Sequence, residues 1–303
     1  MNRRSITVRI PASTANLGPG FDCLGMALNL WNETVLSIEE NGLEIKIQGE
    51  GRDVLPRDSQ NQIARAFYYF FKARRLPAPG GLRIQCNNQI PLGSGLGSSA
   101  AACLGGLMAA NGFSGNEASI EEILSLALEM EGHPDNVAAA LLGGLVIVVR
   151  DQDTILTRRF DVPDLRVVVV IPEIDLPTEV ARAALPLQVP LIDAVFNLGR
   201  TALVCDAIRM GDYSLLGKVM VDCLHQPYRL PLILGGEQAL RAAIQAGASA
   251  VAISGAGPGL IAFSSQAGER VAAAMAAEFE SRNVACRTLF LSSSNQGAVS
   301  DII

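Results

Sequence analysis

The chain has few aromatic residues and no cluster of basic ones. Aromatic residues make up 5% of its 303 residues, and 24 Lys and Arg stand against 30 Asp and Glu. A nucleic-acid-binding surface needs clustered Lys and Arg to neutralise phosphates, so that class of function is disfavoured. Hydrophobic residues reach 49% and charged ones 18%, which excludes a disordered chain. The composition predicts a soluble globular protein.

Long hydrophobic runs are also missing. The N-terminal segment MNRRSITVRIPAS alternates apolar and polar residues, whereas a signal peptide needs a continuous apolar stretch of roughly 7–15 residues. The longest apolar run, at 137–149, is interrupted by Gly143 and Gly144 and is shorter than the roughly 18 residues that suggest a membrane span. The six cysteines are scattered and form no CxxC pair, which argues against a disulfide framework and a zinc site. We therefore expect a cytoplasmic protein without a membrane partner.

The length favours two packed domains, because a single core usually stops growing at roughly 250 residues. A turn-rich, charged stretch at 150–164 is the best boundary, and it predicts domains at 1–157 and 158–303. Periodicity indicates α+β structure in both halves. Strands are expected at 6–10, 35–38, 43–47, 82–86, 143–149, 167–171, 250–254, 259–263 and 286–292, and helices at 63–71, 98–111, 120–131, most of 178–246, and 267–282.

The sharpest motif is the segment PLGSGLGSSAA at 91–101, which follows a predicted strand and opens a predicted helix. Glycines at 93, 95 and 97 permit positive φ angles and close approach of the backbone to a ligand. Ser98 and Ser99 fall where a helix N-cap and first turn are expected, so free N–H groups and the helix dipole would face an anion. The segment predicts a polyphosphate site.

Two familiar phosphate motifs do not fit this segment. A Walker loop needs GxxxxGK[ST], and no Lys stands here; a dinucleotide fingerprint needs GxGxxG, and the glycines fall at GxGxG. An ordinary glycine-rich turn with a serine cap remains an alternative reading. Two further glycine-rich segments favour function: PASTANLGPGFD at 11–22 and ISGAGPGL at 253–260, although a tight hairpin would also explain the second.

The three loops together resemble the GHMP kinase superfamily of small-molecule kinases. Within it the chain is most similar to the homoserine kinases, in PASTANLGPGFDCLGMAL at 11–28, EGHPDNVAAALLGG at 131–144, HQPYR at 225–229 and SGAGPGL at 254–260. The resemblance covers essentially the whole chain in order. It implies an N-terminal domain like ribosomal protein S5 domain 2, a C-terminal ferredoxin-like domain, and ATP bound between them with Mg²⁺. The implied activity is ATP-dependent phosphorylation of the hydroxyl of L-homoserine to O-phospho-L-homoserine, in threonine biosynthesis.

The resemblance also implies roles for individual residues. The ATP phosphates would be held by Pro91, Leu92, Gly93, Ser94, Gly95, Leu96, Gly97, Ser98, Ser99, Ala100 and Ala101. Magnesium would take the Ser98 hydroxyl and a carboxylate, either Glu129 or Glu131, with Glu131 preferred; hard oxygen ligands suit this ion. The acceptor would be bound by Asn16, Asp22, His133, Asn136, Thr178, Arg182, Arg229, Gly255 and Gly257. In this set Asp22 pairs with the α-amino group, the arginines bind the α-carboxylate as guanidinium forks, and the glycine loop brings N–H groups to the phosphate.

The residues expected to act in catalysis are Asn136, Arg182 and Ser98. Homoserine kinases resemble one another in lacking an Asp base and in having an Asn near that place, so catalysis would depend on positioning and charge neutralisation. Asp135 stays an alternative base. Rival functions are a mevalonate-pathway or shikimate kinase of the same superfamily, a non-catalytic nucleotide sensor, and, less favoured by the glycine spacing, a dinucleotide oxidoreductase. Homodimers are common among such enzymes, but the sequence shows no interface.

Overall fold

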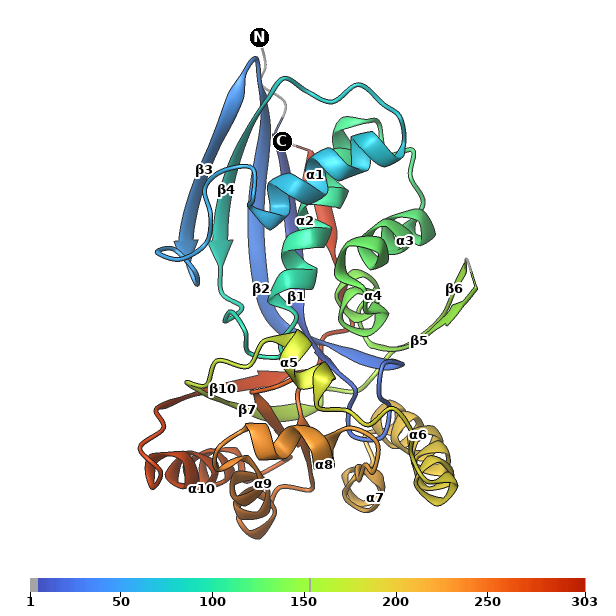
Figure 1. Ribbon diagram of the computed structural model, residues 1–303, viewed down its shortest axis with the longest axis vertical. Coiled ribbons are helices and arrows are strands. Elements are labelled where there is room, and N and C mark those ends of the chain that lie inside the picture. The colour runs from blue at the N-terminus through green and yellow to red at the C-terminus, as the bar shows by residue number, and fades with distance from the viewer. Residues whose placement is uncertain (1–4, 153, 303) are drawn as a thin grey trace.

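The structure, a computed structural model, describes residues 5–152 and 154–302. It has two parts stacked along the long axis, and the first and last strands of the described chain both belong to the first part (Figure 1). The strands of the first part are β1 Ser5–Ala15, β2 Leu24–Glu39, β3 Gly42–Gly49, β4 Gly81–Asn88, β5 Leu145–Asp151, β6 Thr154–Phe160 and β11 Val299–Ile302. Its helices are α1 Gln62–Ala73, α2 Ser98–Phe113, α3 Ile120–Glu131 and α4 Pro134–Leu142.

The first sheet runs in the order β11-β1-β2-β4-β3, and β5 and β6 continue from β2 as a branch. Helices α2 and α4 pack against β1 and β2, and α1 and α3 pack on α2. The predicted periodicity of α1 is confirmed: Ile63, Ala66, Phe67 and Phe70 are buried on one face. The Asn61 side chain caps this helix by accepting from the N–H of Ile63.

The second part contains β7 Arg166–Pro172, β8 Ala250–Ile253, β9 Leu260–Phe263 and β10 Cys286–Ser292 in an antiparallel sheet of order β10-β7-β9-β8. Its helices are α5 Thr178–Ala183, α6 Leu191–Met210, α7 Tyr213–Val219, α8 Gln226–Arg229, η1 Leu230–Leu232, α9 Gly236–Gln245 and α10 Gly268–Glu280. With the helices from α5 to α9 between β7 and β8, and α10 between β9 and β10, the chain order is a split βαβ arrangement. The ferredoxin-like prediction is therefore confirmed.

The stretch at 150–164 differs from the prediction of a turn-rich boundary. Strand β6 pairs continuously with β5, from Leu145 opposite Phe160 to Asp151 opposite Thr154. The hairpin projects from the body of the molecule (Figure 1) and leaves Val149 and Leu156 48% and 57% exposed. Projection explains why its sequence is charged like a linker, and why β5 is buried only at its start rather than throughout. The proposed boundary between 157 and 158 falls inside β6.

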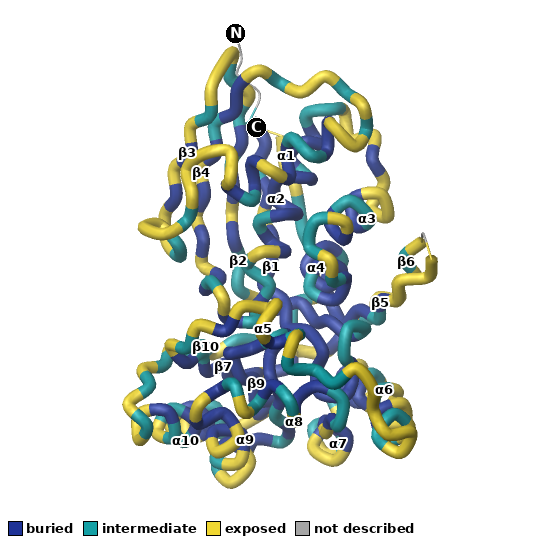
Figure 2. Tube along the Cα trace, in the orientation of Figure 1, coloured by how far each residue is buried: buried dark blue, intermediate teal, exposed yellow. Residues whose placement is uncertain are grey.

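The larger of the two hydrophobic core clusters among the described residues extends through both parts, whereas the smaller one lies within the second part. The larger cluster contains Phe67 and Leu104 of the first part together with Val167 and Ile261 of the second, and Figure 2 shows buried chain running through the junction. The last strand, β11, leaves the second part and pairs with β1. The junction between the two sheets is therefore held by shared core packing and by strand pairing.

Among residues 5–152 and 154–302, no helix combines the length and the apolar character that a membrane span requires.

Candidate functional site

A cavity of about 710 Å³ opens at the junction of the two parts. All three glycine-rich loops reach it, although they are far apart in the sequence. The predicted site residues that line it are Asn16, Asp22, Leu92, Gly93, Ser94, Gly95, Gly97, Ser98, Ser99, Ala100, Glu131, His133, Asn136, Thr178, Arg182, Arg229, Gly255 and Gly257. Three members of the predicted phosphate loop, Pro91, Leu96 and Ala101, are buried and do not line it.

The middle loop has the predicted backbone conformation. Gly93, Gly95 and Gly97 have φ values of 58°, 74° and 73°, a region that favours glycine. Gly97 is itself the N-cap of α2, and no side chain caps this helix, so the expected serine cap is wrong. The reason is that the left-handed turn at Gly97 already directs the chain into the helix. Neither serine hydroxyl is used as a helix cap, and the uncapped N–H groups of α2 face the cavity.

The third loop packs directly on the middle one. The Ser254 hydroxyl donates to the carbonyl oxygen of Gly95 at 2.8 Å, and a Cβ on Gly95 would lie 2.0 Å from the Ser254 carbonyl oxygen. The first loop joins them, because the Asn16 side-chain amide donates to the Gly255 carbonyl oxygen at 2.7 Å. The three loops thus form one connected wall.

One expectation about the third loop is wrong. The N–H of Gly255 donates to the Ala15 carbonyl oxygen at 3.1 Å, and the N–H of Gly257 donates to the Ser254 carbonyl oxygen at 2.9 Å. The N–H of Gly257 is therefore paired inside the turn that joins β8 to β9, and the N–H of Gly255 is paired with the end of β1. These two glycines line the cavity as a tight backbone surface and offer no free N–H to a phosphate.

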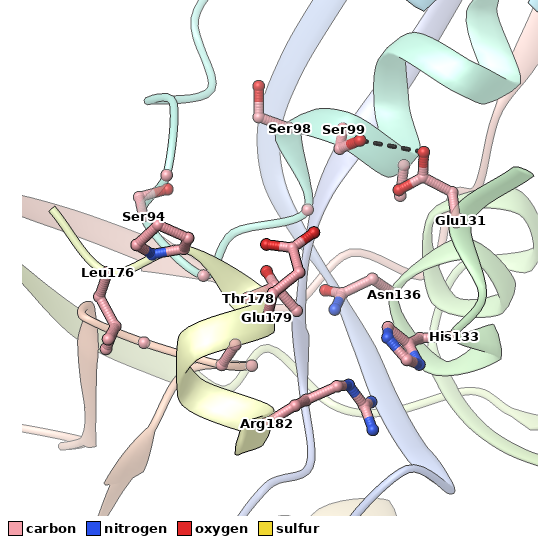
Figure 3. A pocket seen from close by; sticks show the side chains of 18 of the residues that line it. Ser94, Ser98, Ser99, Glu131, His133, Asn136, Leu176, Thr178, Glu179 and Arg182 are labelled. Atoms are coloured by element: carbon pink, nitrogen blue, oxygen red, sulfur yellow. Dashed lines mark hydrogen bonds between the residues drawn. The ribbon is translucent and has the colours of Figure 1, made fainter. Parts of the chain in front are cut away.

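Glu131, at the end of α3, is the carboxylate that faces the helix mouth. The Ser99 hydroxyl donates to Glu131 Oε1 at 2.9 Å (Figure 3), and the Gln62 side-chain amide donates to the same oxygen at 2.8 Å. Burial raises the pKa of this carboxyl. The structure places Ser99, rather than Ser98, against this carboxylate. Glu129 lies outside the cavity lining and accepts a hydrogen bond from the Tyr69 hydroxyl.

Charged groups of opposite sign meet at the other end of the cavity. Arg182 of α5 binds Asp22 through two hydrogen bonds, from NH2 to Oδ1 at 2.6 Å and from NH1 to Oδ2 at 3.1 Å. The guanidinium groups of Arg182 and Arg229 both lie over the Phe21 ring, at 5.6 and 5.1 Å from its centroid. The sequence suggested these charges as ligands for one zwitterion; without a ligand, Asp22 and Arg182 bind each other.

The GHPDN segment supplies the polar groups between the two ends. Asn136 Oδ1 accepts a hydrogen bond from the Ser13 hydroxyl at 3.0 Å, which leaves the Nδ2 donor on the cavity side. Burial and the nearby Arg182 lower the pKa of His133, which favours its neutral imidazole. Burial raises the pKa of Asp135 to about 6, and its Oδ1 accepts from the Asn136 N–H at 2.7 Å. Thr178 reaches the cavity from the first residue of α5.

Some cavity residues had no sequence signal. Gln62 and Glu179 line the cavity, yet both are of types that the sequence uses freely elsewhere. Phe21 lies within the first glycine-rich segment, but its position under two guanidinium groups depends on the fold. His225 had a signal, because it opens the HQPYR segment, but its position under Phe21 depends on the fold.

Comparison with known proteins agrees with this geometry. The family model for the N-terminal domain of GHMP kinases matches residues 61–144, and the model for the GHMP kinase C-terminal region matches residues 204–281. A protein named homoserine kinase from Moorella thermoacetica is 48% identical over 295 residues, covering 96% of this chain and 98% of the relative. Another from Carboxydothermus hydrogenoformans is 42% identical, covering 97% and 96%.

Solved structures show the same relationship. A crystal structure of homoserine kinase from Cytophaga hutchinsonii has a TM-score of 0.85 and 32% identity, covering 99% of this chain and 97% of that one. A mevalonate kinase has a TM-score of 0.67 at 14% identity, a likeness of fold alone. Two family models that together match more than half of the chain, and near-full-length relatives above 40% identity, show that this ATP-using kinase chain belongs to the GHMP kinase family.

Proposed function

We propose that the chain transfers the γ-phosphoryl group of ATP to the side-chain hydroxyl of L-homoserine, giving O-phospho-L-homoserine for threonine biosynthesis. One observation carries the proposal: a single cavity holds an uncapped helix mouth at one end and Asp22, Arg182 and Arg229 at the other. The first suits a polyphosphate and the second an amino acid zwitterion. The relatives named homoserine kinase support the same assignment.

The helix mouth would bind the ATP phosphates through backbone N–H groups of the loop at 93–100. The first turn of α2 contains no acidic side chain that would repel them. Magnesium fits beside it, since the Glu131 carboxylate and the Ser98 and Ser99 hydroxyls are hard oxygen ligands that line the cavity. When bound, this ion would neutralise charge on the phosphates.

The zwitterion would replace the contact between Asp22 and Arg182. Its α-amino group takes the Asp22 carboxylate, and its α-carboxylate takes the guanidinium groups of Arg182 and Arg229. Asn16, His133 and Thr178 line the space between them and supply further polar contacts. This places the acceptor hydroxyl toward the phosphate end.

Catalysis would then depend on alignment. The hydroxyl oxygen forms a bond to the γ-phosphorus, the bond from that phosphorus to the β,γ-bridging oxygen breaks, and the hydroxyl proton passes to the transferred phosphoryl group. Asn136 presents Nδ2 and cannot accept a proton, which favours a mechanism without a protein base. We assign Asn136 and Arg182 to positioning the acceptor and Ser98 to the phosphate end.

An ADP-release assay tests this function with homoserine, mevalonate, galactose and shikimate as acceptors. We expect turnover with homoserine alone, and no turnover with it would refute the assignment. Arg182→Ala removes one carboxylate ligand and should raise KM for homoserine at least about 10-fold while leaving KM for ATP unchanged. An equal effect on both would place Arg182 outside the acceptor site.

Two further expectations accompany this function. All six cysteines are free thiols, which supports a reducing, cytoplasmic compartment. Homodimers are common among similar enzymes, and light scattering of the purified chain measures that state directly.

A further inference from the structure

Arg229 is a buried cation whose contacts on the protein are all to neutral groups. It is 1% exposed and lines the cavity. Its Nε donates to the Ala181 carbonyl oxygen at 3.2 Å, and NH1 lies 3.3 Å from the Gly255 carbonyl oxygen. Within the described ranges no carboxylate lies at ion-pair distance from it. A buried charge is costly without a counter-ion. An anionic ligand in the cavity would supply one, so the direction in which this guanidinium points affects how well such a ligand binds.

His225 lies directly beside this guanidinium. The ring is completely buried, and its Nε2 is 2.8 Å from the Gly18 carbonyl oxygen. A carbonyl only accepts, so Nε2 carries the proton and Nδ1 is left as an acceptor. Nδ1 faces Arg229 NH1 at 3.5 Å. The imidazole therefore accepts from Arg229 at Nδ1 and donates to the Gly18 carbonyl oxygen of the first loop at Nε2.

The same ring also supports the first loop by stacking. The rings of His225 and Phe21 are 5.2 Å apart with 24° between their planes, and the Arg229 guanidinium lies 5.1 Å from the Phe21 centroid. Phe21 precedes Asp22, the carboxylate proposed for the acceptor amino group. One imidazole thus fixes a carboxylate-binding arginine and the segment that presents the amino-binding aspartate.

His225 is itself held by a built turn. The Asp222 carboxylate, buried with it, accepts from the N–H groups of Leu224, His225 and Gln226 at 3.0, 2.9 and 2.6 Å. It also accepts from the Asn197 side-chain amide at 2.7 Å, and that amide reaches the Pro19 carbonyl oxygen at 3.2 Å. These contacts leave the imidazole little freedom to turn.

We propose that His225 is a positioning residue for the acceptor site: as the neutral Nε2–H tautomer it links Gly18 to Arg229 and aims that guanidinium at the acceptor carboxylate. The inference rests on the proposed function. It assigns His225 no contact with the substrate and no proton transfer.

The test compares two substitutions of similar bulk. His225→Phe keeps a ring against Phe21 but removes the donor to Gly18 and the acceptor for Arg229, whereas His225→Gln keeps an amide donor and a carbonyl acceptor. We expect the Phe variant to raise KM for homoserine about 10-fold with KM for ATP unchanged, and the Gln variant to recover most of this loss. If His225→Phe does not fold, His225→Leu removes the same two groups and should show the same selective rise.

A second acceptor distinguishes a positioning role of His225 from general damage to the fold. The amino alcohol 2-amino-1,4-butanediol has a neutral hydroxyl in place of the carboxylate, so it offers Arg229 no anion to bind. We expect the Phe variant to lower kcat/KM much more for homoserine than for this analogue, because the analogue still binds Asp22 through its amino group but has no carboxylate for Arg229. Equal losses with both acceptors, or a Gln variant as poor as the Phe variant, would overturn the inference. Failure of the unsubstituted protein to phosphorylate homoserine would instead refute the proposed function.

Discussion

Replacing Gly95 by Ala tests whether the middle and third loops must touch for the site to exist. The new Cβ would lie 2.0 Å from the Ser254 carbonyl oxygen. Because carbon–oxygen contacts begin near 3 Å, the two loops would have to separate by about 1 Å. The matched control is Gly93→Ala, in the same loop, with positive φ and no atom within 4 Å of the new Cβ.

Both substitutions place an L-residue in the left-handed backbone conformation, and only Gly95→Ala also creates a steric clash. An L-residue in the left-handed region costs about 1–2 kcal/mol, so Gly93→Ala should lower the free energy of unfolding by about that amount. Gly95→Ala adds the clash and weakens the 2.8 Å bond from the Ser254 hydroxyl, worth about 1 kcal/mol. We expect it to lose about 3 kcal/mol or more in total, a large part of an ordinary stability.

Urea unfolding of both variants without ligand measures this difference. The midpoint for Gly95→Ala should lie clearly below that for Gly93→Ala at a similar slope. Phosphoryl transfer should fall about 100-fold in Gly95→Ala, since a shift of about 1 Å misplaces the phosphate-binding N–H groups. Equal midpoints would show that the contact between the loops is not what holds the phosphate site in place.

Two other substitutions probe the carboxylates. Burial raises the pKa of Asp135 to about 6, so between about pH 4 and pH 6 the folded protein keeps a proton that the unfolded chain releases. The contribution of this carboxyl to stability is therefore present below about pH 4 and is lost as the pH rises through 6. The stability of Asp135→Asn relative to the unsubstituted protein should therefore rise by about 3 kcal/mol between pH 4 and pH 8, measured by urea unfolding at several pH values. A difference independent of pH would contradict this. Glu131→Gln should raise the Mg²⁺ concentration for half-maximal rate at least about 10-fold. Glu129→Gln is the control and should leave it unchanged, because Glu129 lies outside the cavity lining and pairs with Tyr69. The reverse result would exchange the roles of the two residues.

Much of the fold could be predicted because local patterns carry it. The buried face of α1 follows from helical spacing, β7 follows from its run of β-branched residues, and β8 and β9 follow from short apolar runs on either side of a glycine-rich turn. Strands β6 and β11 could not be predicted, because β6 is mostly exposed and β11 depends on pairing with β1 at the other end of the chain. The sequence pattern did not predict helix α4, because its apolar residues form a nearly continuous run with those of the following strand, β5.

The site was predictable in its residue types but not in their pairing. The glycine spacing predicted the backbone conformation of the middle loop, since positive φ angles strongly favour glycine. The contact between Asp22 and Arg182 joins positions 160 residues apart, and Ser99 rather than Ser98 meets Glu131 because of the direction in which α2 leaves Gly97. Such contacts are set by tertiary structure, and one sequence contains no signal for them.

The pairing of Asp22 with Arg182 in the ligand-free protein has a consequence for selectivity. The pair is partly exposed, with side chains 34% and 29% accessible, so opening it costs about 1 kcal/mol or less. A zwitterion repays this by giving each partner a new ion, with charge-assisted bonds worth about 1.5–3 kcal/mol each. A ligand with only a carboxylate would satisfy the arginine and leave Asp22 without its cation, and one with only an amine would do the reverse. The ion pair therefore selects against acceptors that lack either charge, such as mevalonate, and this selection needs no steric exclusion.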